Sequence, residues 1–140
     1  MNVELIYPMA AMVLLTFIVL IATFRSRVKA VKSGEADAAF YKTYQEGGEP
    51  RQTAQLSRHF VNLFEAPTLF YVACVVGMVT GQNAGVLILL AWIYVSLRII
   101  HSYIHTGSNK LQPRIAAYFT SWLVLLSMWG TLVYGVASSQ

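Results

Sequence analysis

The sequence predicts an all-α integral membrane protein that crosses the bilayer four times, and three observations lead to this class. The 140-residue chain is 56% hydrophobic and only 11% charged, about half the charged fraction of an ordinary soluble domain. Its apolar residues form four blocks, each close to the roughly 20 residues that a helix needs to cross the hydrocarbon core. The sequence shows no β-barrel pattern, and the backbone of a lipid-exposed span needs internal hydrogen bonds. The blocks cover residues 5–24, 60–79, 84–104 and 115–136.

The first block is interpreted as a retained helix rather than a cleaved secretory signal. It lacks a basic region before its apolar run, and it ends in Thr-Phe-Arg-Ser-Arg instead of a small-residue cleavage site. We expect a single domain with helices over about residues 4–31, 54–80, 84–106 and 113–137, and a cytoplasmic loop over about 32–53.

Helix-breaking and helix-capping residues predict the bounds of the second span. Gly and Pro within residues 47–50 would stop the helical start of the loop, and Thr53 offers a cap for the helix that follows. Pro67 leaves the carbonyl of Leu63 without its helical donor, which predicts a kink next to Glu65. Cys74, the single cysteine, is expected to be a small core residue, and no intrachain disulfide or thiol-based metal cluster is possible.

The basic residues predict the orientation of the chain. All ten fall on one side of the predicted membrane: Arg25, Arg27, Lys29, Lys32, Lys42, Arg51, Arg58, Arg98, Lys110 and Arg114. The loop at 81–83 and the tail at 137–140 hold none, so the positive-inside rule places both termini outside and both basic loops in the cytoplasm. Because topology explains the net charge of +4, no nucleic-acid partner is expected.

Ionisable residues interrupt the second and third spans. A charged side chain in lipid costs free energy, so such residues usually face the interior of a helix bundle. Two trios each share one helix face by their spacing: Arg58, Asn62 and Glu65, and Arg98, His101 and His105. Glu65 and Arg98 both lie about 10 Å from their cytoplasmic helix ends, so they can meet at one depth. Arg114 and Tyr118, at i and i+4 in the first turns of the fourth helix, could close the same cavity.

The surplus of positive charge in this cluster predicts a small anionic ligand. Arginine binds carboxylates bidentately, whereas Glu65 and Asn62 could hold an ammonium or amide group of the same zwitterionic, peptide-like molecule. One alternative is a buried ion pair between Glu65 and Arg98 that only fixes helix register. Another is a proton pathway through the same residues, although the outer halves of the helices lack a continuing polar line.

A metal or haem site is a further alternative, because His101 and His105 form an H-x-x-x-H pair. No third ligand is predicted nearby, since His59 lies off the face that carries Asn62 and is interpreted as interfacial. The sequence therefore predicts no metal.

These residues together resemble a known family, the membrane-associated proteins in eicosanoid and glutathione metabolism (MAPEG). The resemblance covers most of the chain and rests on the order of three motifs: Arg58-x-x-x-Asn62-x-x-Glu65-x-Pro67 in the second span, Arg98-x-x-His101 in the third, and Arg114-x-x-x-Tyr118 opening the fourth. Arg25 and Arg27, at the end of the first helix, also resemble the basic pair of microsomal glutathione transferases and prostaglandin E synthase.

The resemblance implies a homotrimer that holds glutathione between neighbouring subunits near the cytoplasmic face, with a lipophilic substrate arriving from the bilayer. It implies glutathione contacts from a set of eight residues: Arg25, Arg58, Asn62, Glu65, His101, His105, Arg114 and Tyr118. Arg98 would support Glu65. The implied location is a multi-pass position in a membrane, which we expect to be the bacterial inner membrane.

The chemistry implied by the resemblance is a glutathione transferase or peroxidase reaction. The protein would lower the pKa of the glutathione thiol with nearby positive charge and hydrogen-bond donors. Arg114 is the candidate for the charge and Tyr118 for the donor, and the thiolate would attack a lipophilic electrophile or a lipid hydroperoxide.

The sequence departs from better-known members of the family at two positions. Val61 precedes Asn62 where an arginine is common, and His105 stands where a tyrosine is frequent. Both positions would touch the ligand, so the second hypothesis is a non-catalytic lipid-binding or scaffold protein of the same fold.

Overall fold

The computed structural model describes residues 3–45, 47–81 and 84–139, and its regular structure there is entirely helical. A 3₁₀ turn, η1 (Val3–Leu5), leads into α1 (Ile6–Lys32). The other helices are α2 (Phe40–Thr43), α3 (Arg51–Asn62), α4 (Ala66–Thr80), α5 (Ala84–Thr106) and α6 (Leu111–Ala137). Gln82 and Asn83 of the predicted outer loop, and residues 1, 2, 46 and 140, lie outside the described residues.

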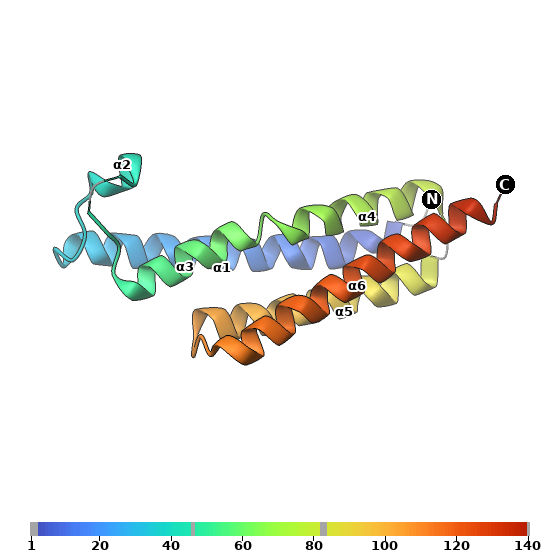
Figure 1. Ribbon diagram of the computed structural model, residues 1–140. Coiled ribbons are helices and arrows are strands. Elements are labelled where there is room, and N and C mark those ends of the chain that lie inside the picture. Colours follow the sequence, from blue (N-terminus) through green and yellow to red (C-terminus); the bar gives the residue numbers. More distant parts are fainter. Residues whose placement is uncertain (1–2, 46, 82–83, 140) are drawn as a thin grey trace.

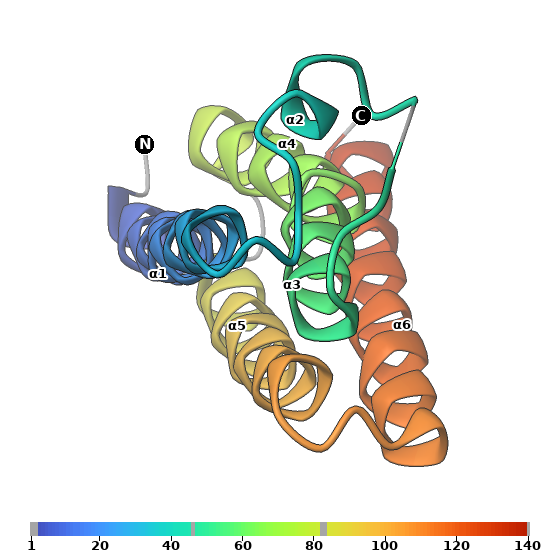
Figure 2. The same ribbon diagram turned by 90° about the vertical axis from the view of Figure 1, so that its left-hand side faces the viewer.

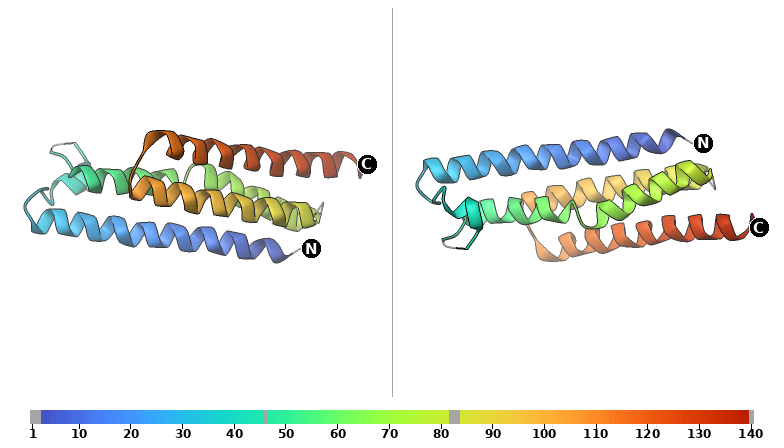
Figure 3. Two further views of the ribbon diagram at one scale, coloured as in Figure 1. Left: turned by 90° about the horizontal axis from the view of Figure 1, so that it is seen from below. Right: turned by 90° about the horizontal axis from the view of Figure 1, so that it is seen from above.

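Four stretches within the described residues are long and apolar enough to cross a membrane: Val3–Lys32, Arg51–Thr80, Ala84–Thr106 and Leu111–Ala137. They form an elongated bundle in which α5 packs against α6, α1 against α3, and α4 against α6 (Figures 1 and 2). The start of α1 and the end of α6 lie at one end of the bundle, and α2 lies at the other (Figures 1 and 3). The predicted all-α membrane bundle is confirmed.

The second span is broken into two helices rather than simply kinked. Helix α3 ends at Asn62 and α4 begins at Ala66. Pro67 has no N–H group to offer the carbonyl of Leu63, and Phe64 and Glu65 instead make short-range bonds to residues three positions before them. The break predicted near Glu65 is therefore present, and it frees backbone carbonyls inside a membrane span.

The core lies along the bundle axis and is apolar in the half that contains α4. Phe70 of α4 and Tyr94 of α5 are fully buried, and their rings stack with centroids 4.6 Å apart. Gly77 permits the closest approach, because a Cβ added there would lie 2.9 Å from a methyl carbon of Leu87. Cys74 is buried in this core, as expected. Many large apolar side chains face outward, as lipid-facing helices require.

Side-chain contacts tie α1 to α3 at the end of the bundle that carries α2. The guanidinium of Arg27 donates to the Ser57 hydroxyl at 2.9 Å and forms a 3.3 Å ion pair with Glu49. The predicted cap at Thr53 is wrong: α3 begins at Arg51, and the Thr53 side chain is buried within it, bonded to Ser26 of α1.

Candidate functional site

A polar cavity of about 190 Å³ opens between α3, α5 and α6. Its lining residues are Asn62, His101, His105, Arg114, Ile115 and Tyr118. Five of these six are polar residues that the sequence pattern singled out. Helix α3 and the consecutive helices α5 and α6 therefore bring these five predicted residues together around one cavity.

Arg98 is fully buried beside the break in the second span. Its Nη2 atom donates to the side-chain oxygen of Asn62 at 2.7 Å and to the Asn62 carbonyl at 3.3 Å. The Asn62 amide in turn donates to a carboxylate oxygen of Glu65 at 3.1 Å. Among the described residues, Glu65 and Arg98 form no direct ion pair, which was the alternative interpretation. Asn62 instead links them through hydrogen bonds to both side chains.

The helix break explains this chain of hydrogen bonds. A carbonyl at the end of α3 has lost its usual partner four residues later, and a buried guanidinium with several donors can satisfy it. Because Asn62 occupies the space between Arg98 and Glu65, the carboxylate of Glu65 stays at the exposed surface of the span.

Arg114 is positioned from two sides at the start of α6. Its Nη1 atom donates to the Asn109 side-chain oxygen at 2.6 Å, and its carbonyl accepts a 3.1 Å bond from Nδ1 of His101. Asn109 has a φ of 50° in the turn between α5 and α6, a conformation that asparagine tolerates better than most residues. Tyr118 lies one turn further, with its ring centroid 5.6 Å from that of His101.

A second cavity of about 300 Å³ adjoins the first and shares His105 and Arg114 with it. Its lining residues are Arg51, Ala54, Gln55, Arg58, His105, Asn109 and Arg114. Three arginines face this space, and none of its described lining residues is acidic. A pocket of this composition attracts anions, and arginine is well suited to carboxylates.

A larger groove of about 790 Å³ lies on the other side of Arg58. Arg58 and Glu65 line it together with apolar residues that include Phe60 and Val61. Arg25, which was predicted to reach the ligand, is exposed and lines none of these three spaces. Arg27 takes the position at the groove instead.

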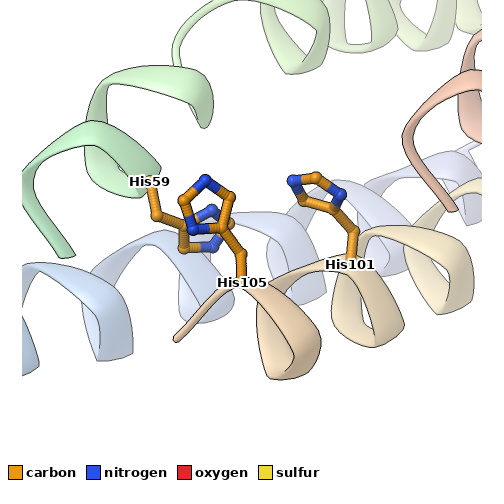
Figure 4. Close-up of side chains that lie close together, drawn as sticks. All are labelled: His59, His101 and His105. Carbon is orange, nitrogen blue, oxygen red and sulfur yellow. The ribbon is translucent and has the colours of Figure 1, made fainter. Parts of the chain in front are cut away.

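The prediction for His59 is wrong. Its side chain is fully buried rather than interfacial, and it hydrogen-bonds the Ser102 hydroxyl of α5. The His59 ring lies 4.8 Å from the ring of His105 and 5.6 Å from that of His101, centroid to centroid (Figure 4). The third histidine that the H-x-x-x-H pair lacked is therefore present.

The sequence contained a signal for this placement. Leu56, His59 and Leu63 stand at i, i+3 and i+7, and all three are buried. This spacing marks the buried stripe of α3. The face through Arg58 and Glu65 lies beside that stripe, and both of these residues are exposed. Gln55 was also not predicted as a site residue. Its side-chain amide donates to the His105 carbonyl at 2.5 Å.

Comparison with known proteins gives one finding. The sequence profile of the MAPEG family matches residues 5–134, which is nearly the whole chain. A comparison with curated protein sequences found no match.

Proposed function

This chain belongs to the MAPEG family, and from that premise we propose that it is a membrane-bound glutathione transferase or peroxidase. The observation that carries the proposal is the pair of adjoining cavities, whose lining includes Arg58, Arg114 and Tyr118. Glutathione is a peptide with two carboxylates, one ammonium and a thiol. Its carboxylates match the surplus arginine of these cavities, and its ammonium matches the carboxylate of Glu65 in the groove on the other side of Arg58.

The proposed roles follow from charge and position. Arg58 would bind a carboxylate of glutathione, and Glu65 with Asn62 would hold its ammonium group. Arg98 is fully buried and bonded to Asn62, so it would position that amide rather than contact the ligand. His101 and His105 line the first cavity and would complete its polar wall.

Arg114 and Tyr118 are the proposed catalytic residues. A guanidinium beside the sulfur favours the thiolate over the thiol, and a phenol donor stabilises it further. The thiolate would then form a bond to an electrophilic carbon, which releases a leaving group or opens a ring. With a lipid hydroperoxide, the thiolate sulfur would bond to the terminal peroxide oxygen, break the O–O bond and release an alcohol. The resulting sulfenic acid of glutathione would then react with a second glutathione to give the disulfide and water.

A homotrimer is part of the proposal, and the exposure of Glu65 supports an assembly. This carboxylate lies within the Arg51–Thr80 span and is exposed on the single chain. Charged groups at such depth normally face protein or a water-filled cavity. A neighbouring copy that covers the groove would give Glu65 such a setting and place the ligand between subunits near the cytoplasmic face. We place this trimer in the bacterial inner membrane, with both termini outside.

The experiment is glutathione binding and conjugation by protein purified in detergent. We expect glutathione-dependent turnover with an apolar electrophile, and a large loss of kcat in Arg114→Ala with a modest loss of affinity. Lys110→Ala, which removes an exposed cation four residues earlier, is the matched control and should keep its activity. Folded protein that neither binds glutathione nor turns over would refute the proposal.

A non-catalytic lipid-binding protein is the second candidate, and Val61 favours it. This side chain is 60% exposed and lines the large groove where an arginine would add an anion contact. Phe60 and Val61 beside Arg58 form a surface that suits an acyl chain with an anionic headgroup. The candidate predicts that anionic lipid binds to the groove while glutathione has no measurable effect.

A further inference from the structure

All three histidines of the chain lie in one cluster. His59 comes from α3, whereas His101 and His105 lie one turn apart on α5, and Figure 4 shows their rings gathered in the space between the two helices. Each ring offers one nitrogen such that the three atoms lie within 4.8 Å of one another. This convergence joins positions 42 and 46 residues apart in the sequence, so local spacing does not produce it.

Each ring presents a buried nitrogen without a hydrogen-bond partner among the described residues: Nδ1 of His59, Nε2 of His101 and Nδ1 of His105. His59 is 0% exposed and His101 only 3%. Buried polar atoms are nearly always paired in proteins, because an unpaired one costs about 1–3 kcal/mol. Three such atoms in one cluster therefore need a shared partner.

The second ring nitrogens of His59 and His101 are already hydrogen-bonded in the pattern of metal-binding histidines. The carbonyl of Arg114 can only accept, so Nδ1 of His101 carries the proton and Nε2 carries the lone pair. The Ser102 hydroxyl can accept from Nε2 of His59, which leaves the lone pair on Nδ1. Metal-bound histidines almost always donate their second nitrogen in this way, and the bond fixes the ring's tautomer and orientation.

We propose that His59, His101 and His105 bind a divalent transition-metal ion, Zn²⁺ foremost, with the fourth coordination position open to the polar cavity. Three imidazoles with an open position are a known zinc arrangement. A tetrahedral ion about 2.1 Å from each nitrogen needs nitrogen pairs about 3.4 Å apart. The widest separation of 4.8 Å must then close by about 1.4 Å, which small side-chain rotations achieve.

The charges around the cluster set the character of the fourth ligand. Arg98 lies one turn before His101 on α5, and Arg114 lines the same cavity as His101 and His105. Two guanidinium groups disfavour a bare dication, so the fourth ligand is an anion such as hydroxide or a thiolate. His101 and His105 line that cavity, and such an anion would reach the ion through it.

This inference does not depend on glutathione. The histidines form the binding site for the metal alone, whether or not the cavity takes a peptide thiol. The two proposals can therefore fail separately, and the experiment contains metal without glutathione.

The test is metal content and binding of full-length protein purified in detergent without a polyhistidine tag. After saturation with Zn²⁺ and gel filtration, we expect one zinc per chain by elemental analysis. Co²⁺ substitution should give the intense visible absorption of a four-coordinate site. His59→Phe, His101→Phe and His105→Phe keep a ring of similar shape but remove one ligand. Each should weaken Zn²⁺ binding by at least about 100-fold, the upper end of the loss from removing an outer-shell partner.

Two control variants separate this site from adventitious binding. Cys74→Ala removes the only thiol, and Ile115→Val alters the cavity lining without removing a polar group. Both should bind zinc as the unmodified protein does. The proposal is overturned if the folded unmodified protein takes up no stoichiometric Zn²⁺ or lacks the Co²⁺ spectrum. It is equally overturned if any one of the histidine variants keeps full affinity while gel filtration shows it folded.

Discussion

Replacing Arg98 by methionine should destabilise the protein through Asn62, and a double-mutant cycle can isolate this effect. The guanidinium is fully buried, and Nη2 bonds both oxygens of Asn62 at the broken end of α3. Methionine retains an unbranched aliphatic stem but has no donor. The Asn62 side-chain oxygen therefore loses this bond, and the Asn62 carbonyl keeps only its 3.4 Å bond from the Glu65 N–H. The change tests whether a buried cation holds the helix break that positions the site.

The magnitude follows from the two contacts. The 2.7 Å bond to the Asn62 side chain involves a charged donor and should contribute about 1.5–3 kcal/mol, whereas the 3.3 Å bond to the carbonyl is longer and weaker. Nε and Nη1 of Arg98 have no partner among the described residues, so removing the charge also relieves some desolvation cost. We expect a net loss of about 1–3 kcal/mol in the free energy of unfolding for Arg98→Met.

The assay is reversible unfolding in detergent of Arg98→Met, Asn62→Ala and the double variant. The coupling energy should be about 1.5–3 kcal/mol, because the side-chain bond disappears in either single variant. Ile99→Met, at the exposed neighbouring position, should change stability by less than about 0.5 kcal/mol. A coupling energy below about 0.5 kcal/mol, the scatter for independent sites, would refute the assigned role of Arg98.

Three further changes have defined outcomes. Asn109→Gly keeps the backbone conformation but removes the hydrogen bond to the Arg114 guanidinium. Steady-state kinetics should show about a tenfold lower kcat/KM with glutathione. An unchanged kcat/KM would mean that this bond does not position the guanidinium. Gly77→Ala places a methyl group 2.9 Å from a leucine side chain and should lower the free energy of unfolding in detergent by about 1–3 kcal/mol. In the control Gly130→Ala the added methyl group meets no atom within 4 Å, so this variant should not lose stability. Equal effects of the two changes would contradict the close packing at Gly77. Val61→Arg restores the arginine of better-known family members at the groove, and calorimetry should show about tenfold tighter glutathione binding, since an added charged contact contributes about 1.5 kcal/mol. Unchanged affinity would place the ligand elsewhere.

The four apolar blocks of the sequence predicted the membrane bundle well. Apolar blocks of spanning length need no knowledge of packing, because lipid allows few alternatives to a helix. Pro67 identified the region of the break for a similarly local reason, the missing N–H group. The extent of the break was not predictable, because it depends on Arg98 reaching Asn62 from another helix.

Placement of side chains around the helices was the weaker part of the prediction. The spacing of Arg58 and Glu65 predicts a functional face that lies beside the buried stripe of α3. On this prediction His59 lies at the membrane interface, but its side chain is 0% exposed. Helical spacing leaves the facing side undetermined when charged and apolar stripes adjoin. Contacts across helices settle this, as the bonds of His59 to Ser102 and of Arg98 to Asn62 illustrate.

Thiolate formation is the most direct test of the central claim that this chain activates glutathione. Ultraviolet difference absorbance at neutral pH should show thiolate when glutathione binds to the unmodified protein in detergent. Arg114→Ala should bind glutathione but show little thiolate, because the guanidinium that lines the cavity is gone. Glutathione that binds the unmodified protein and stays a thiol, or equal thiolate in Arg114→Ala, would contradict the account.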